Sequence, residues 1–173
     1  MDTLGFVNKD IEEDPNAPKY IKPDGTKVYE QYFPEGTLVY EIKPDKTFIS
    51  RAYNKSGEMY MDYIRKGNFE LGHYYDECGL KVYEYDAAYD NNNNLVVKNE
   101  KVYAYYENNQ IASEFYFKLP ENIKIQTTFD ETGKKTGKIE FKGSVKIYYD
   151  ENNKPYKREI DRGSGGIITE NIE

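Results

Sequence analysis

The chain contains 173 residues, of which 38% are hydrophobic and 32% charged, and its formal net charge is −7. This length suffices for one domain with a core or for a short array of repeats. The acidic balance and the lack of a dense Lys/Arg cluster argue against nucleic-acid binding, which needs a basic patch. The apolar runs are only a few residues long, far below the roughly 20 residues that a membrane-spanning helix needs, so no membrane insertion is expected.

The two ends of the chain differ in composition from its middle. Residues 1–20 are acidic and contain Pro15 and Pro18, which indicates an N-terminal arm or, alternatively, one short pairing segment. Acids occupy the positions where a signal peptide has its basic region, so we expect a cytoplasmic protein. Residues 161–173 contain a Gly/Ser-rich piece and then a short apolar patch, which predicts a flexible C-terminal tail or, alternatively, one last strand.

Residues 21–160 have the pattern of a β-hairpin repeat domain. The chain's 19 Tyr and 8 Phe favour strands, and no segment shows a convincing helical period. Apolar and polar residues alternate in 111–119, 123–129 and 138–149, which is the period of a half-buried strand. Short polar turns join these segments. We therefore predict an all-β fold, an antiparallel meander of repeated β-hairpins forming an extended twisted sheet.

A short motif recurs between the predicted strands: an aromatic residue, a polar turn, and Gly or Asn. Gly and Asn both tolerate the positive φ that tight turns require, so the constant feature is a backbone shape. One hairpin cannot bury its apolar face alone, which predicts that the units stack side by side. The copies begin at Tyr53, Tyr75, Tyr106, Phe129 and Tyr149, and looser copies begin at Phe33 and Tyr89.

Three of these units, "YYENNQI" (105–111), "YYDENNKP" and "YYDECGLK", resemble the MORN-like repeats of the YwqK-type antitoxin group. The consensus of that group is two aromatics, a polar residue, Asn, Gly, a polar residue and an aliphatic residue. The resemblance covers roughly residues 26–160, with Asn109 in place of Gly and with Lys81 and Pro155 in place of the aliphatic residue. It implies an array of β-hairpins. Because some members occur beside genes for secreted toxins, it also implies an antitoxin or immunity role.

Residues able to carry out catalysis or bind metal are few. His73 is the single histidine and lacks the partners of a triad or zinc site, so we interpret it as a structural strand residue. Cys78 is the single cysteine, in an acidic turn that disfavours a reactive thiolate. Asp90, Asn92 and Asn94 alternate as in a calcium loop, but the required Gly and Glu are missing. No nucleotide-binding or hydrolase motif occurs, and we predict a non-enzymatic protein without a cofactor or metal.

The remaining candidate for function is a surface. If the aromatics beside the turns face the packed side of the sheet, neighbouring tyrosines such as Tyr74, Tyr103, Tyr105 and Tyr148 face the other side. They could simply cover a thin sheet, or they could form a protein interface, for which Tyr is well suited. The predicted partner-binding residues are Tyr60, Asp62, Tyr74, Glu84, Asp86, Asp90, Tyr103, Tyr105 and Tyr148.

The expected partner is a protein, namely a cognate bacterial toxin that this chain occludes. The acidic balance either keeps the protein soluble or steers a basic partner, and the second reading makes the toxin basic. A structural or envelope-associated repeat scaffold is the first alternative. A small-molecule-binding β protein or an enzyme is the second, and it requires a deep closed pocket with converging polar groups.

Overall fold

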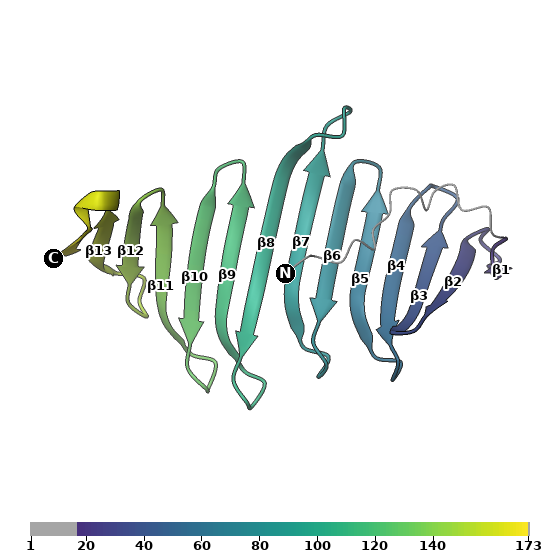
Figure 1. Cartoon of the computed structure of the whole chain (residues 1–173), viewed down its shortest axis with the longest axis horizontal. Coiled ribbons are helices and arrows are strands. Elements are labelled where there is room, and N and C mark those ends of the chain that lie inside the picture. The colour runs from purple at the N-terminus through teal and green to yellow at the C-terminus, as the bar shows by residue number, and fades with distance from the viewer. Residues whose placement is uncertain (1–16, 173) are drawn as a thin grey trace.

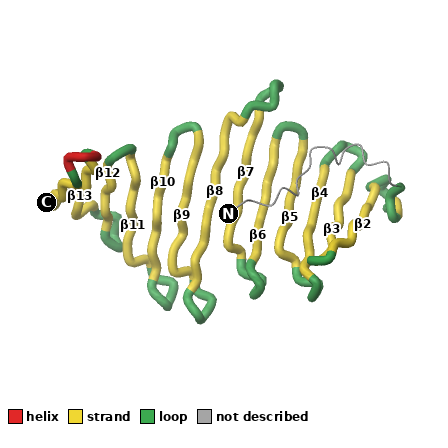
Figure 2. Tube along the Cα trace, viewed as in Figure 1, coloured by secondary structure: helices red, strands yellow, loops and turns green. Residues whose placement is uncertain are grey.

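The computed structural model describes residues 17–172 and contains one open antiparallel sheet of 14 strands (Figure 1). The strands lie across the sheet in sequence order, so each pairs with the next along the chain, and β1 and β14 are the two outermost strands. The one helix in this range is a short 3-10 turn, η2 (Gly163–Gly165), drawn in red in Figure 2. The predicted all-β antiparallel meander is confirmed. Residues 1–16 of the predicted N-terminal arm lie outside the described residues.

Each strand is between two and eleven residues long. In chain order they are β1 (Tyr20–Ile21), β2 (Lys27–Phe33), β3 (Gly36–Ile42), β4 (Phe48–Asn54), β5 (Met59–Lys66), β6 (Phe69–Tyr75), β7 (Lys81–Tyr89), β8 (Leu95–Tyr105), β9 (Ile111–Leu119), β10 (Ile123–Phe129), β11 (Lys135–Lys142), β12 (Val145–Tyr149), β13 (Pro155–Asp161) and β14 (Ile167–Asn171).

The segment predicted as one strand, 138–149, is a hairpin in the structure, so that prediction is wrong. Lys142 pairs with Val145, which leaves a two-residue loop. Gly143 has φ 61 and opens this loop, as the first position of a type II′ turn requires. In the C-terminal segment, the alternative of a last strand is the one that the structure contains, because β14 pairs with β13 over five residues.

Eight turns of the sheet share one backbone shape. In each, the N–H of the first residue donates to the carbonyl of the fifth, and the N–H of the fourth donates to the carbonyl of the first. The fourth residue always has positive φ, as in a type I turn followed by a left-handed residue. The eight turns span 22–26, 43–47, 54–58, 76–80, 90–94, 106–110, 130–134 and 150–154.

The exchange of Asn for Gly has the expected explanation, since Asn109 and Asn153 occupy the left-handed position with φ 65 and 63. Lys46 occupies it too, with φ 62, in a turn that the motif did not predict. Near Phe33 the chain makes a different, two-residue turn, because Phe33 pairs directly with Gly36.

The two faces of the sheet have different chemistry, because residues paired across neighbouring strands project from the same face. We call one the tyrosine face: its central row runs through Tyr29, Tyr40, Ser50 and Tyr63. The core lies on this face, over β3–β5. Its buried residues are Leu38, Tyr40, Ala52, Met61 and Tyr63.

Gly72 continues the central row of the tyrosine face because a side chain would not fit there. It pairs with Tyr63 on one side and Tyr85 on the other. A Cβ atom on Gly72 would lie 2.4 Å from the ring of Tyr85. The tyrosine ring therefore lies over the glycine and covers the backbone that a side chain would otherwise cover.

The left-handed turn position gives a stability prediction. We expect Lys46→Gly to raise the free energy of unfolding by up to about 1 kcal/mol, because an L-residue at positive φ is strained and glycine is not. Lys55→Gly is the matched control, since Lys55 occupies the second position of the same kind of turn and should lose stability slightly. Urea unfolding of both variants measures the difference. Equal shifts of the two midpoints would contradict the explanation.

Candidate partner-binding surface

The second face of the sheet, which we call the charged face, carries a ladder in which acids alternate with basic residues and the single histidine of the chain. Its central row runs through Arg51, Asp62, His73, Glu84 and Lys101, one residue from each of β4 to β8. Opposite charges directly across neighbouring strands attract one another and fix the register. Most charges in this row are therefore already paired within the protein.

The predicted acids of this row are engaged by neighbours. Asp62 lies 3.5 Å from the Nε atom of Arg51, and its other oxygen lies 3.6 Å from Nδ1 of His73. Glu84 accepts hydrogen bonds from Lys81 at 2.7 Å and from the hydroxyl of Tyr103 at 2.7 Å. Glu84 is thus held by two hydrogen bonds, whereas Asp62 has only the longer contacts to Arg51 and His73, and its Oδ1 atom is buried without a hydrogen bond.

Burial opposes the ionisation of Glu84, whereas hydrogen bonds from Lys81 and Tyr103 favour it. Together with the charges of Lys81 and Lys101 they hold the pKa of Glu84 below its usual range. Burial, and then the hydrogen bond to Glu84, raise the pKa of the Tyr103 hydroxyl above its usual range. At neutral pH the pair is thus a carboxylate that accepts from a neutral phenol.

The structure brings five of the nine predicted partner-binding residues onto the charged face. Asp86 accepts a hydrogen bond from Asn99 at 2.8 Å, and Tyr105 donates to the backbone carbonyl of Lys81. The five are Asp62, Glu84, Asp86, Tyr103 and Tyr105.

The prediction of one common face is wrong for two of the tyrosines. Tyr74 pairs with Met61 and packs against the core on the tyrosine face. Tyr148 pairs with Ile139 on the same face and donates to Glu159 at 2.6 Å. The reason is that Tyr75 and Tyr149, the aromatics directly beside the turns, lie on the charged face rather than on the packed one, which leaves Tyr74 and Tyr148 on the tyrosine face.

The other two predicted residues lie at the ends of strands. Asp90 begins the turn 90–94 and accepts hydrogen bonds from the amides of Asn92 and Asn94, both at 2.8 Å. Tyr60 lines a groove at the opposite edge, where burial and the nearby charge of Glu35 raise its pKa. The nine residues therefore do not form one surface.

The unpaired acids lie in a row of turns along one side of the sheet, a feature that the sequence prediction missed. We call it the acidic edge: it consists of the turns that join β2–β3, β4–β5, β6–β7, β8–β9, β10–β11 and β12–β13, at the bottom of Figure 1. These turns contain three lysines, Lys55, Lys134 and Lys154, against nine acids. The acids are Glu35, Glu58, Asp76, Glu77, Glu107, Asp130, Glu131, Asp150 and Glu151.

Four exposed acids of this edge have no ion pair or hydrogen bond to their carboxylates from any described residue. They are Glu35, Glu77, Glu107 and Glu131. The others have structural partners: Asp76, for example, accepts from the amides of Cys78 and Leu80, both at 2.9 Å. Four uncompensated negative charges thus project from one side of the sheet.

The turns at the opposite edge lack such an excess. They carry four acids and four bases: Asp24, Asp45, Asp90 and Glu121 against Lys22, Lys43, Lys46 and Arg162. Asp24, Asp45 and Asp90 accept hydrogen bonds from turn amides, and Glu121 pairs with Lys118 at 2.9 Å. The charge of the chain is therefore distributed unevenly between its two edges.

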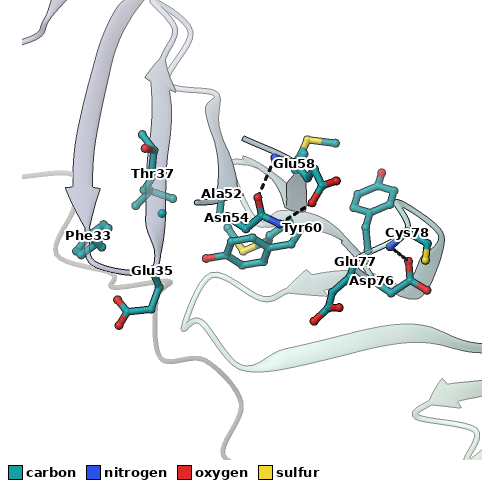
Figure 3. Close-up of a pocket in the computed structure, with 15 residues that line it drawn as sticks. Phe33, Glu35, Thr37, Ala52, Asn54, Glu58, Tyr60, Asp76, Glu77 and Cys78 are labelled. Carbon is teal, nitrogen blue, oxygen red and sulfur yellow. Dashed lines mark hydrogen bonds between the residues drawn. The ribbon is translucent and has the colours of Figure 1, made fainter. Parts of the chain in front are cut away.

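A groove of about 820 Å³ opens at the acidic edge, at the ends of β3–β6 (Figure 3). Its floor is apolar and consists of Leu38, Ala52 and Met61, all buried in the core. Met59 and Tyr60 add further apolar surface to its walls. The groove is therefore a direct opening from the core cluster to the acidic edge.

The rim of the groove is acidic. Glu35 comes from the β2–β3 turn and Glu77 from the β6–β7 turn, and Figure 3 shows them on either side of Tyr60. Glu58 is held by Asn54, which donates to its carboxylate at 2.9 Å and accepts from its amide at 2.9 Å. An apolar floor inside an acidic rim has the chemistry to bind a group that is apolar in the centre and cationic around it.

Within residues 17–172 no three His, Cys, Asp or Glu side chains are placed to share a metal ion. No helix in that part of the chain is long and apolar enough to span a bilayer.

Comparisons with known proteins assign the chain to no family. No protein-family model matches the chain, and no curated protein matches it. Among solved structures, a mutant of S. aureus TarM in complex with fondaparinux, alpha-GlcNAc-glycerol and UDP matches 75% of this chain. The identity is 10% and the TM-score 0.32, and the chain spans 21% of that protein. This likeness is too distant to indicate a fold or a function for the chain.

The engaged state of Glu84 predicts a pH dependence. Its folded-state pKa lies below the ordinary value of 4.5, so its stabilisation is complete above that value and is lost as the pH falls through the folded-state pKa. We expect Glu84→Gln to lower the free energy of unfolding at pH 7 by about 1 kcal/mol, after allowance for solvent screening.

Urea unfolding at pH 7 and near pH 3 measures this effect, and the gap between wild type and Glu84→Gln should narrow at the lower pH. Glu107→Gln is the control, because its exposed carboxylate has no partner among the described residues and should change stability little at either pH. A gap that stays constant with pH would contradict the assignment.

Proposed function

We propose that this chain is a non-enzymatic protein-binding module that recognises a basic protein through its acidic edge. The observation that carries the proposal is the set of four exposed, uncompensated carboxylates, Glu35, Glu77, Glu107 and Glu131, on one edge only. A surface of one sign attracts partners of the other sign and speeds their association. The charged face serves this role less well, because its charges are paired internally.

The resemblance to the YwqK-type antitoxin group makes a cognate bacterial toxin the proposed partner. In this proposal the module acts as an immunity or antitoxin-like protein in the cytoplasm and blocks the toxin sterically. A preformed sheet with a long row of turns suits occlusion, because it can cover an extended surface without a disordered segment having to fold on binding. The alternative of a structural or envelope-associated repeat scaffold needs no such partner.

Co-expression with the product of the gene immediately upstream tests the proposal. We expect that product to co-purify with this chain, and a cell that expresses it as a toxin to be protected. A lack of both binding and protection would sink the immunity role. An upstream gene that encodes an envelope or structural protein would favour the scaffold.

The acidic edge gives a quantitative prediction for the same pair. We expect the triple variant Glu77→Gln, Glu107→Gln, Glu131→Gln to associate about tenfold more slowly at low salt and to lose much of its salt dependence. Stopped-flow measurement of the association rate at two ionic strengths provides the readout. The matched control changes the total charge equally at the other edge, through Asn91→Lys, Asn92→Lys and Ser144→Lys. Equal slowing by both variants would leave only net charge as the cause.

A further inference from the structure

We infer that the groove at the acidic edge binds a short protein segment with an apolar centre and lysine or arginine residues on both sides. The inference rests on the proposed function for its premise that the partner is a basic protein, and it adds where on the sheet the partner is anchored and by what chemistry.

The floor of the groove defines the apolar centre of the segment. Leu38, Ala52 and Met61 offer no hydrogen-bonding side chain, so a polar group placed on them would lose its water without compensation. Met59 and Met61 are unbranched and can adjust to different apolar shapes. A volume of about 820 Å³ is within the range that holds drug-sized ligands, so it accommodates a few side chains rather than a whole helix.

The rim defines the charge of the flanks. Glu35 and Glu77 come from different turns, lie on opposite sides of Tyr60, and have no cationic partner among the described residues. Cations on both sides of an apolar centre would meet both carboxylates at once. A segment with acidic flanks would meet like charges and would be excluded.

Two other occupants of the groove are disfavoured by charge. A second copy of this chain would bring one acidic edge close to another. Residues 1–16 contain Asp2, Asp10, Glu12, Glu13 and Asp14 but only one lysine, Lys9, so that segment has the same sign as the rim.

Three labelled hexapeptides test the inference by fluorescence anisotropy with the full chain. The first has a Leu-Phe centre with two lysines on each side. The second replaces the centre with Ser-Ser, and the third replaces the lysines with glutamates. We expect the first to bind and the other two to bind at least about tenfold more weakly. Equal binding of the first two would overturn the role of the apolar floor.

Two variants locate the site. Glu35→Gln with Glu77→Gln should weaken binding of the first peptide about fivefold, since each removes one charge pair at the surface. Met59→Asp should weaken it tenfold or more by placing a charge among apolar side chains. Asn91→Lys with Ser144→Lys is the matched control and should leave binding unchanged, because it alters the total charge by the same amount at the opposite edge, away from the groove. Circular dichroism confirms that each variant is folded.

The outcomes separate this inference from the proposed function. If the upstream gene product binds wild type and Met59→Asp equally, the groove is not the anchor, although the module still binds its partner. If the peptide binds in the groove but no toxin is neutralised, the immunity role fails and the site stands. A dimer by light scattering that Met59→Asp dissociates would assign the groove to a second copy and overturn the inference.

Discussion

The left-handed residue at the fourth position of each five-residue turn is the constraint on which the rest of this structure depends. It lets the chain reverse within five residues and closes the same two backbone hydrogen bonds in eight turns. In six of them the strand pairing shifts by one residue at the aromatic beside the turn, as at Tyr53, Tyr75 and Tyr105. Because side chains alternate between faces, a slip of one residue would exchange the tyrosine face with the charged face. The turns therefore determine which residues meet the core.

A sheet this thin is stabilised unevenly along its length. Buried residues occur in β2–β7, and from residue 88 to the end of the described chain none is buried. There the surface is covered by rings and lysine stems, as where Lys138 lies 4.0 Å from the ring centre of Tyr149 and Lys157 lies 4.4 Å from that of Tyr148. Such contacts are individually weak. Opening of the C-terminal hairpins should therefore require less free energy than opening of the core strands.

The repeat can be recognised in the sequence, but the faces and surfaces that its turns create cannot. Aromatic residue, polar turn and Gly or Asn predicted the hairpins correctly, because that motif reports backbone shape directly. The turn at Lys46 could not be predicted, because lysine does not signal positive φ. The hairpin at Gly143 could not be predicted either, because glycine also fits an alternating strand. The predicted face is wrong for Tyr74 and Tyr148 because the alternation of polar and apolar residues does not say which of two adjacent aromatics faces the core. The groove and the acidic edge were missed because their residues come from turns 20 to 30 positions apart.

The position of the unpaired acids within the turns argues that they are not there to support the fold. An acid at the first position of a turn accepts amide hydrogen bonds, as Asp76 and Asp130 do, whereas the second position makes no such demand. At the acidic edge this undemanding position holds Lys55 in the turn 54–58 and a glutamate in the other four turns, namely Glu77, Glu107, Glu131 and Glu151, of which Glu151 pairs with Lys134; at the other edge it holds Pro23, Pro44 and Asn91. Successive turns on one edge are two strands apart, about 10 Å, which is close to the screening length of physiological salt. From the turn 76–80 onward, neighbouring glutamates thus act together, and a partner that meets this part of the edge encounters a line of charge rather than isolated carboxylates. Lys55, in the turn 54–58, separates Glu35 from this line.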